Sequence, residues 1–105
     1  TDAMVAGKHI SPAEVEALLY RHPAVQEACV VSVPDDYRGE SVKAVVVLRQ
    51  GLKAQPSAED LIAWSRTQMA IYKAPRAIEF VETLPKSSSG KVLWREVQRQ
   101  HATPS

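Results

Sequence analysis

Two short valine-rich runs separated by a polar loop constrain the fold of this chain most strongly. Residues 28–33 read ACVVSV and residues 42–48 read VKAVVVL, and β-branched residues in such runs favour strands. The stretch between them, PDDYRGE at 34–40, has the composition of a loop. Two strands joined by a loop of this length most simply form an antiparallel pair, so a sheet is expected around this hairpin.

Four further segments carry helix or strand signals. Ser11, Pro12 and Glu14 form the pattern of a helix start, with an N-cap, a proline in the first position and a capping-box acid. Ser57 predicts the N-cap of a second helix, which has two acids in its first turn. Residues 77–84, AIEFVETL, predict a third strand, and residues 92–100, VLWREVQRQ, predict a short last helix.

The order of these elements predicts an α+β domain. We expect a small three-stranded, mainly antiparallel sheet with helices packed against one side of it, preceded by a short hairpin-like N-terminal segment. The 105 residues suffice for one domain with a modest core but are few for a complete enzyme. The opening TDAMVAGKHI resembles the interior of a longer protein, which suggests a fragment.

Charge and apolar patterning argue against two classes of partner. The 13 Lys and Arg residues against 12 Asp and Glu give a net charge of +1, which gives no drive toward nucleic acid or an anionic membrane. No apolar run approaches the ~20 residues of a membrane span, so no transmembrane segment is expected. The single cysteine, Cys29, cannot form an internal disulfide and lies between apolar residues, so we expect a small buried hydrophobe.

The stretch PKSSSGKVLWRE at 85–96 contains the strongest candidate for chemistry, Lys91. A phosphate-binding loop is excluded by spacing, because Pro85 stands where that motif needs glycine and Val92 where it needs Ser or Thr. The serines predict a mobile loop. From the residues alone, a solvated lysine is the more common interpretation, and a catalytic lysine remains the alternative.

A metal site is not expected. The three histidines, His9, His22 and His101, lie far apart in the sequence, with no cysteine or acidic partner at ligand spacing. No pattern of a catalytic triad or carboxylate pair is present either. The residues by themselves therefore assign no reaction.

Three stretches in order carry a family resemblance: GKHISPAEVE, HPAVQEACVVSVPDDYRGESVKAVVVL and YKAPRAIEFVETLPKSSSGKVLWRE. Together they resemble the C-terminal domain of adenylate-forming enzymes, over residues 2 to about 98. That superfamily includes acyl-CoA synthetases, adenylation domains of peptide synthetases and firefly luciferase. The chain is most similar to the AMP-forming ligases that join fatty or aryl acids to coenzyme A.

The resemblance implies that residues 1–105 are the C-terminal lid domain of a larger enzyme. The N-terminal domain, absent here, would hold the carboxylic acid and ATP with Mg²⁺. The acid would react with ATP to give an acyl-adenylate, and coenzyme A would then displace AMP to give a thioester. The isolated chain is expected to be inactive, the enzyme to be cytoplasmic, and the partners to be its own N-terminal domain, the acid, ATP and coenzyme A.

The same resemblance assigns residue roles on the serine loop. Lys91 matches the family's adenylation lysine, whose ammonium would offset the repulsion between the carboxylate and the α-phosphate. Ser89 and Gly90 would support it, with Gly90 letting the loop backbone approach the ligand.

Further roles fall near the N-terminus. Gly7, Lys8 and His9 match the loop that would line the thiol tunnel after the domain rotates, and Asp2 is the candidate hinge residue. The sequence departs from the family here, with Ala6 in place of a glycine and His9 in place of a polar residue such as asparagine.

Two alternatives remain open. One is an amino-acid or aryl-acid adenylation domain that loads a carrier protein in place of coenzyme A. The other, from a different class, is a free-standing α+β binding module without ATP chemistry. The acid substrate would be chosen by the N-terminal domain.

Overall fold

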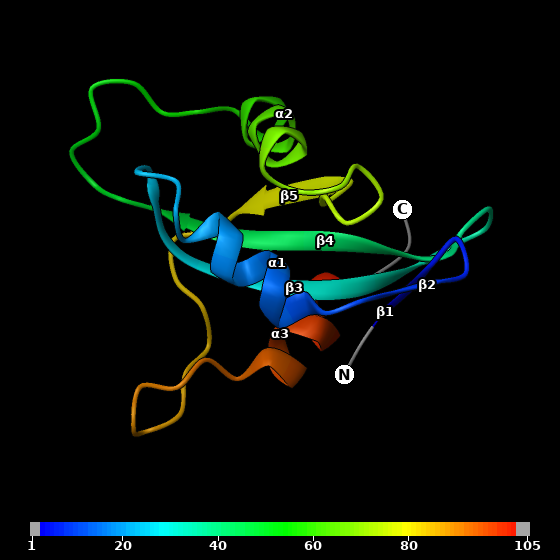
Figure 1. Cartoon of the computed structure of the whole chain (residues 1–105). Helices are drawn as coiled ribbons and strands as arrows, with labels where there is room; N and C mark the ends of the chain where they lie inside the picture. Colours follow the sequence, from blue (N-terminus) through cyan, green and yellow to red (C-terminus); the bar gives the residue numbers. More distant parts are fainter. Residues whose placement is uncertain (1–2, 103–105) are drawn as a thin grey trace.

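The computed structural model describes residues 3–102, so the hinge candidate Asp2 lies outside the described residues. The elements run in the order β1 (Ala3–Val5), β2 (Lys8–Ile10), α1 (Pro12–Leu19), β3 (Val25–Asp35), β4 (Gly39–Leu48), α2 (Ala58–Gln68), β5 (Ala77–Phe80) and α3 (Trp94–His101). Figure 1 shows the sheet with its helices. Within these residues, no helix is long and apolar enough to cross a membrane.

The β3–β4 hairpin forms the centre of a five-stranded sheet. Its antiparallel register runs from Val25 opposite Leu48 to Asp35 opposite Gly39. On its other side, β4 pairs with β1 near its start and with β5, in parallel, farther along. The α+β class and the mainly antiparallel sheet are confirmed. The sheet has five strands, not three, because the N-terminal hairpin of β1 and β2 joins it and does not stand apart.

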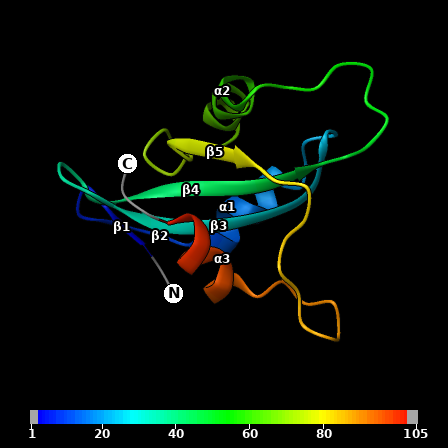
Figure 2. The same ribbon diagram turned by 180° about the vertical axis from the view of Figure 1, so that it is seen from behind.

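Apolar side chains cover both faces of the hairpin. On one face, Val30 and Val46 belong to a buried cluster with Leu19 of α1 and Leu61 of α2. The opposite face belongs to a second cluster with α3, made of Cys29, Val31, Val45, Val47, Leu84 and Val97. Figures 1 and 2 show α2 and α3 on opposite sides of the sheet. The prediction that all helices pack on one side is therefore wrong, since strands that are apolar on both faces need cover on both.

The helix starts follow the sequence signals unequally. Ser57 forms a capping box with Asp60, because its hydroxyl accepts the Asp60 N–H at 3.0 Å and its own N–H donates to the Asp60 carboxylate at 3.0 Å. Ser11 is the N-cap residue of α1 but makes no side-chain capping bond. Glu14 instead pairs with Lys73 at 3.3 Å, so the predicted capping box of the first helix is wrong.

A two-residue turn connects β1 to β2. Val5 and Lys8 are paired, which leaves Ala6 and Gly7 as the turn, with φ of +52° and +78°. Positive φ at both central residues is the requirement of a type I′ hairpin turn, which matches the twist of its strands. Glycine adopts this conformation without steric cost, whereas the Cβ of Ala6 is strained there.

The strain at Ala6 gives a prediction for stability. We expect Ala6→Gly to raise the free energy of unfolding by about 0.5–1 kcal/mol, because the relieved strain exceeds the added chain entropy. Ala63→Gly, the same change on the exposed side of α2, should lower it by about 1 kcal/mol. Urea denaturation of the three chains measures both, and a loss of stability in Ala6→Gly would contradict the strain argument.

Candidate functional site

Lys91 lies on a short hydrogen-bonded hairpin. Lys86 and Val92 form an antiparallel bridge, and the Leu93 N–H donates to the Pro85 carbonyl at 2.9 Å. Gly90, at the tip, has φ of +85°. The serine-rich composition predicts a mobile loop, but the structure shows a closed turn with cross-chain hydrogen bonds. Figure 1 shows this hairpin, which follows β5 and precedes α3 in the chain, extending below the sheet.

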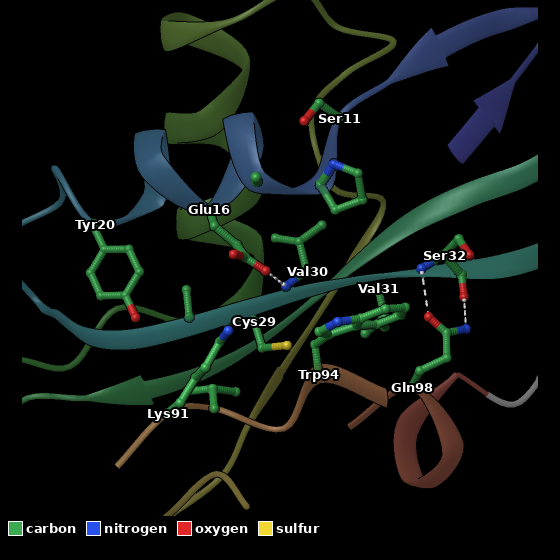
Figure 3. A pocket seen from close by; sticks show the side chains of 14 residues that line it. Ser11, Glu16, Tyr20, Cys29, Val30, Val31, Ser32, Lys91, Trp94 and Gln98 are labelled. Carbon is green, nitrogen blue, oxygen red and sulfur yellow. Dashed lines mark hydrogen bonds between the residues drawn. The ribbon is translucent and has the colours of Figure 1, made fainter. Parts of the chain in front are cut away.

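The lysine borders a pocket of about 380 Å³ between α1, β3 and the start of α3. Glu16 of α1 and Tyr20, the C-cap residue of that helix, line it on one side, and Cys29 lines it from β3 (Figure 3). Trp94, the first residue of α3, is 40% exposed and completes the wall. The pocket therefore combines a carboxyl group, an ammonium group and two aromatic rings at one surface.

Glu16 and Gln98 close the outer edge of β3 beside this pocket. The Glu16 carboxylate accepts the Val30 N–H at 2.7 Å. The Gln98 side chain bonds Ser32 twice, accepting its N–H at 3.3 Å and donating to its carbonyl at 2.7 Å. Burial raises the pKa of Glu16, and the bond from Val30 opposes this only in part. The Glu16 carboxyl group thus satisfies a backbone N–H at the strand edge, and it loses part of its own hydration in doing so.

Cys29 is not the nucleophile of this pocket. Its side chain is 1% exposed, and burial, with a smaller contribution from the Glu16 charge, raises the pKa of its thiol to about 12. The thiol is therefore protonated at neutral pH, when only a thiolate would attack. The prediction of a small buried hydrophobe is confirmed.

The ammonium of Lys91 has no ion-pair partner within residues 3–102, unlike those of two other lysines. Lys86 pairs with Glu27, and Lys43 pairs with Glu79 at 2.8 Å. Lys91 is exposed, so its charge is available to an anion brought to this surface. The structure places Ser89 and Gly90 next to it in the turn, with the Ser89 hydroxyl 3.0 Å from that of Ser87.

The second group of predicted site residues lies on the β1–β2 hairpin. Gly7 is exposed, and a Cβ added there would meet nothing within 4 Å. The Lys8 ammonium lies over the Tyr72 ring, 4.6 Å from its centroid. His9 is exposed and is paired with Met4 across the hairpin.

The structure does not bring these two groups together. Both views place the β1–β2 turn at one end of the molecule and the Lys91 hairpin at the other (Figures 1 and 2). No group of three or more His, Cys, Asp or Glu side chains within residues 3–102 could hold a metal ion. Any chemistry at the two loops therefore takes place at separate surfaces.

Sequence reasoning missed the contribution of Glu16 and of Ser87, which bonds Lys91 across the turn. No local pattern links Glu16 to Val30, since the two are 14 residues apart. For Ser87, the four-residue spacing to Lys91 around a glycine was an available sign of a tight hairpin.

The sequence of this chain is similar to a known protein family and to individual ligases. Residues 14–91 match the model of a family described as AMP-binding enzyme C-terminal domain. A long-chain-fatty-acid–CoA ligase from Bacillus subtilis is 50% identical over 97 residues, which cover 91% of this chain and 17% of the relative. A fatty acid–[acyl-carrier-protein] ligase, ScoC, from Streptomyces coeruleorubidus is 44% identical over 95 residues, covering 90% of this chain and 18% of the relative.

A solved structure agrees with the sequence matches. An acyl-CoA synthetase from Brucella canis superposes with a TM-score of 0.81 at 41% identity, covering 96% of this chain and 20% of that structure. The chain thus spans about a fifth of the length of the proteins it matches.

The partly buried carboxyl group of Glu16 gives this site a testable pH dependence. The pKa of Glu16 is raised in the folded state. Its favourable contribution to the free energy of unfolding is therefore complete below the unfolded pKa and is lost as pH rises through the folded pKa. Glu16→Gln keeps an oxygen for the Val30 N–H but cannot ionise. We expect the variant to match the parent at pH 3.5 and to be the more stable chain at pH 7, as measured by urea denaturation across that range.

If the difference in free energy of unfolding between Glu16→Gln and the parent stayed constant with pH, ionisation of Glu16 would not destabilise the folded state. A variant that is less stable at pH 7 would show that the carboxylate is stabilised as an ion, as pairing with Lys91 would do. Either result would contradict the assignment of desolvation as the larger effect.

Proposed function

The chain belongs to the family of AMP-binding enzyme C-terminal domains, and from that premise we propose that it is the lid domain of an AMP-forming acyl-CoA ligase. The observation that carries the proposal is the ammonium of Lys91, which lies on an exposed hairpin and has no ion-pair partner within residues 3–102. By resemblance, this residue matches the family's adenylation lysine. The rest of the enzyme would bind ATP, its Mg²⁺ and the carboxylic acid.

In the first half-reaction, a carboxylate oxygen forms a bond to the α-phosphorus of ATP. The bond from that phosphorus to the bridging oxygen breaks, and pyrophosphate leaves. Both reactants are anions, so a cation placed between them lowers the barrier without forming a bond itself. Lysine suits this role because it carries a compact charge on a flexible stem. The Lys91 hairpin would extend that charge into the site of the larger domain.

In the second half-reaction, the thiol sulfur bonds to the acyl carbon, and the thiol proton passes to solvent. The bond from the acyl carbon to the phosphate oxygen breaks, and AMP leaves. The β1–β2 turn at Gly7 would then face the larger domain. This turn and the hairpin of residues 85–93 lie at opposite ends of the molecule in both views. The separation supports a rotation of the domain between the steps, so that each loop would face the larger domain in its own step.

The identity of the thiol has two candidates. The Bacillus subtilis relative is named as a CoA ligase and the Streptomyces coeruleorubidus relative as an acyl-carrier-protein ligase. We propose coenzyme A as the acceptor, with a carrier protein as the second candidate. Incubating the full-length enzyme and its acyl-adenylate with each acceptor, and measuring AMP release, distinguishes them.

One test of the proposed function concerns Lys91 in the full-length enzyme. Lys91→Ala should slow the adenylation half-reaction by about 100-fold to 1000-fold, the usual cost of losing one preorganised charge-stabilising group. Thioester formation from supplied acyl-adenylate should remain near the parent rate, because the lysine is turned away in that step. Pyrophosphate release and thioester formation, measured separately, give the two rates.

Lys53→Ala is the matched control, since Lys53 is also exposed but lies in the loop before α2. It should leave both rates unchanged. If Lys91→Ala slows both half-reactions equally, or neither, Lys91 is not the adenylation lysine of this enzyme.

Another test of the proposed function concerns Gly7. If the thiol passes close to the β1–β2 turn, a large side chain there obstructs it, so Gly7→Leu should block thioester formation while pyrophosphate release stays nearly normal. Acyl-adenylate should then accumulate on the enzyme, which a single-turnover assay detects.

Backbone strain needs its own control, because Gly7 has φ of +78° and any side chain is disfavoured there. Gly51→Leu provides it, since Gly51 has φ of +77° and equally open surroundings. An equal effect of both substitutions on the thiol step would overturn the role of the Gly7 turn.

A further inference from the structure

We propose that Ser87 is a positioning residue for Lys91, whose hydroxyl fixes the backbone from which the lysine side chain extends. The hydroxyl oxygen accepts the Lys91 N–H at 3.2 Å. In the other direction, the Ser87 N–H donates to the Lys91 carbonyl at 2.9 Å. The consequence for catalysis rests on the proposed function of Lys91, whereas the effect on the turn does not.

The geometry of the turn explains why a side chain is needed there. The Ser87 carbonyl accepts the Gly90 N–H at 2.9 Å, and Gly90 takes a positive φ of +85°. A turn followed by a left-handed glycine is the usual three-residue hairpin with a bulge. With the Ser87 carbonyl bonded to Gly90, the Lys91 N–H has a single acceptor within residues 3–102, the Ser87 hydroxyl.

The base of this hairpin turn contacts the sheet. Lys86, adjacent to Ser87, forms an ion pair with Glu27 of β3 and a bridge with Val92. Ser87 therefore lies on a hairpin base that is linked to β3, and its half-buried side chain connects that base to the backbone of Lys91. Ser88, by contrast, is exposed at the tip, and its hydroxyl has no partner in the described part of the chain.

Amide exchange on the chain itself tests the first part of the inference. Ser87→Ala removes the acceptor, Ser87→Thr keeps it, and Ser88→Ala is the matched control. NMR should show the Lys91 amide exchanging about fivefold faster in Ser87→Ala, the factor expected for one lost hydrogen bond. Exchange in the core strands β3 and β4 should be unchanged, and Ser87→Thr and Ser88→Ala should match the parent.

The half-reactions of the full-length enzyme test the second part. Ser87→Ala should lower the maximal adenylation rate about fivefold with little change in the KM for ATP, and should leave thioester formation from acyl-adenylate intact. Ser87→Thr should restore adenylation. A purely structural role would instead slow both half-reactions and would speed exchange in β3 and β4 as well.

Two results would overturn the inference. One is an unchanged Lys91 exchange rate in Ser87→Ala, and the other is an equal effect of Ser88→Ala. Failure of the proposed function is distinguishable from both. If Ser87→Ala speeds Lys91 exchange but neither it nor Lys91→Ala affects adenylation, the turn geometry holds and the assignment of Lys91 fails, together with the catalytic part of this inference.

Discussion

The antiparallel pairing of β3 with β4 is the interaction on which the other elements depend. Its alternating side chains are buried on both faces, so one face binds α1 and α2 while the other binds α3. β4 also provides the edge on which β1 and β5 pair. The ion pair from Lys86 to Glu27 of β3 links the hairpin of Lys91 to the same unit. The β1–β2 turn and the Lys91 hairpin are thus both attached to the β3–β4 pair, at opposite ends of the molecule.

The outer edge of β3 determines where the pocket lies. An exposed strand edge presents unpaired backbone groups, which invite association with another strand. Here Glu16 of α1 and Gln98 of α3 bond to Val30 and Ser32 at that edge. The two helices cover opposite faces of the sheet, and the pocket lies between them at this edge, beside Lys91. Glu16 and Gln98, which protect the edge, therefore also line the pocket.

Local features were predictable from the sequence, and long-range ones were not. The valine runs predicted β3 and β4, and Ser57 predicted its helix start, because each signal acts over a few residues. The addition of β1 and β2 to the sheet, the cover on both faces and the bond from Glu16 to Val30 depend on contacts between distant segments, which no local pattern specifies. From the residues alone Lys91 was more simply a solvated lysine, and only the resemblance favoured the catalytic role. The order of its serine hairpin came from the bonds of Ser87 across the turn.

We propose that the two distant loops of this domain face the rest of the enzyme in turn. Hydrogen–deuterium exchange of the full-length enzyme, followed by mass spectrometry, tests it most directly. With a stable acyl-adenylate analogue alone, residues 85–93 should be protected and residues 3–10 should not. Addition of coenzyme A should reverse the pattern. Protection of both segments together, or of neither in both states, would contradict the account.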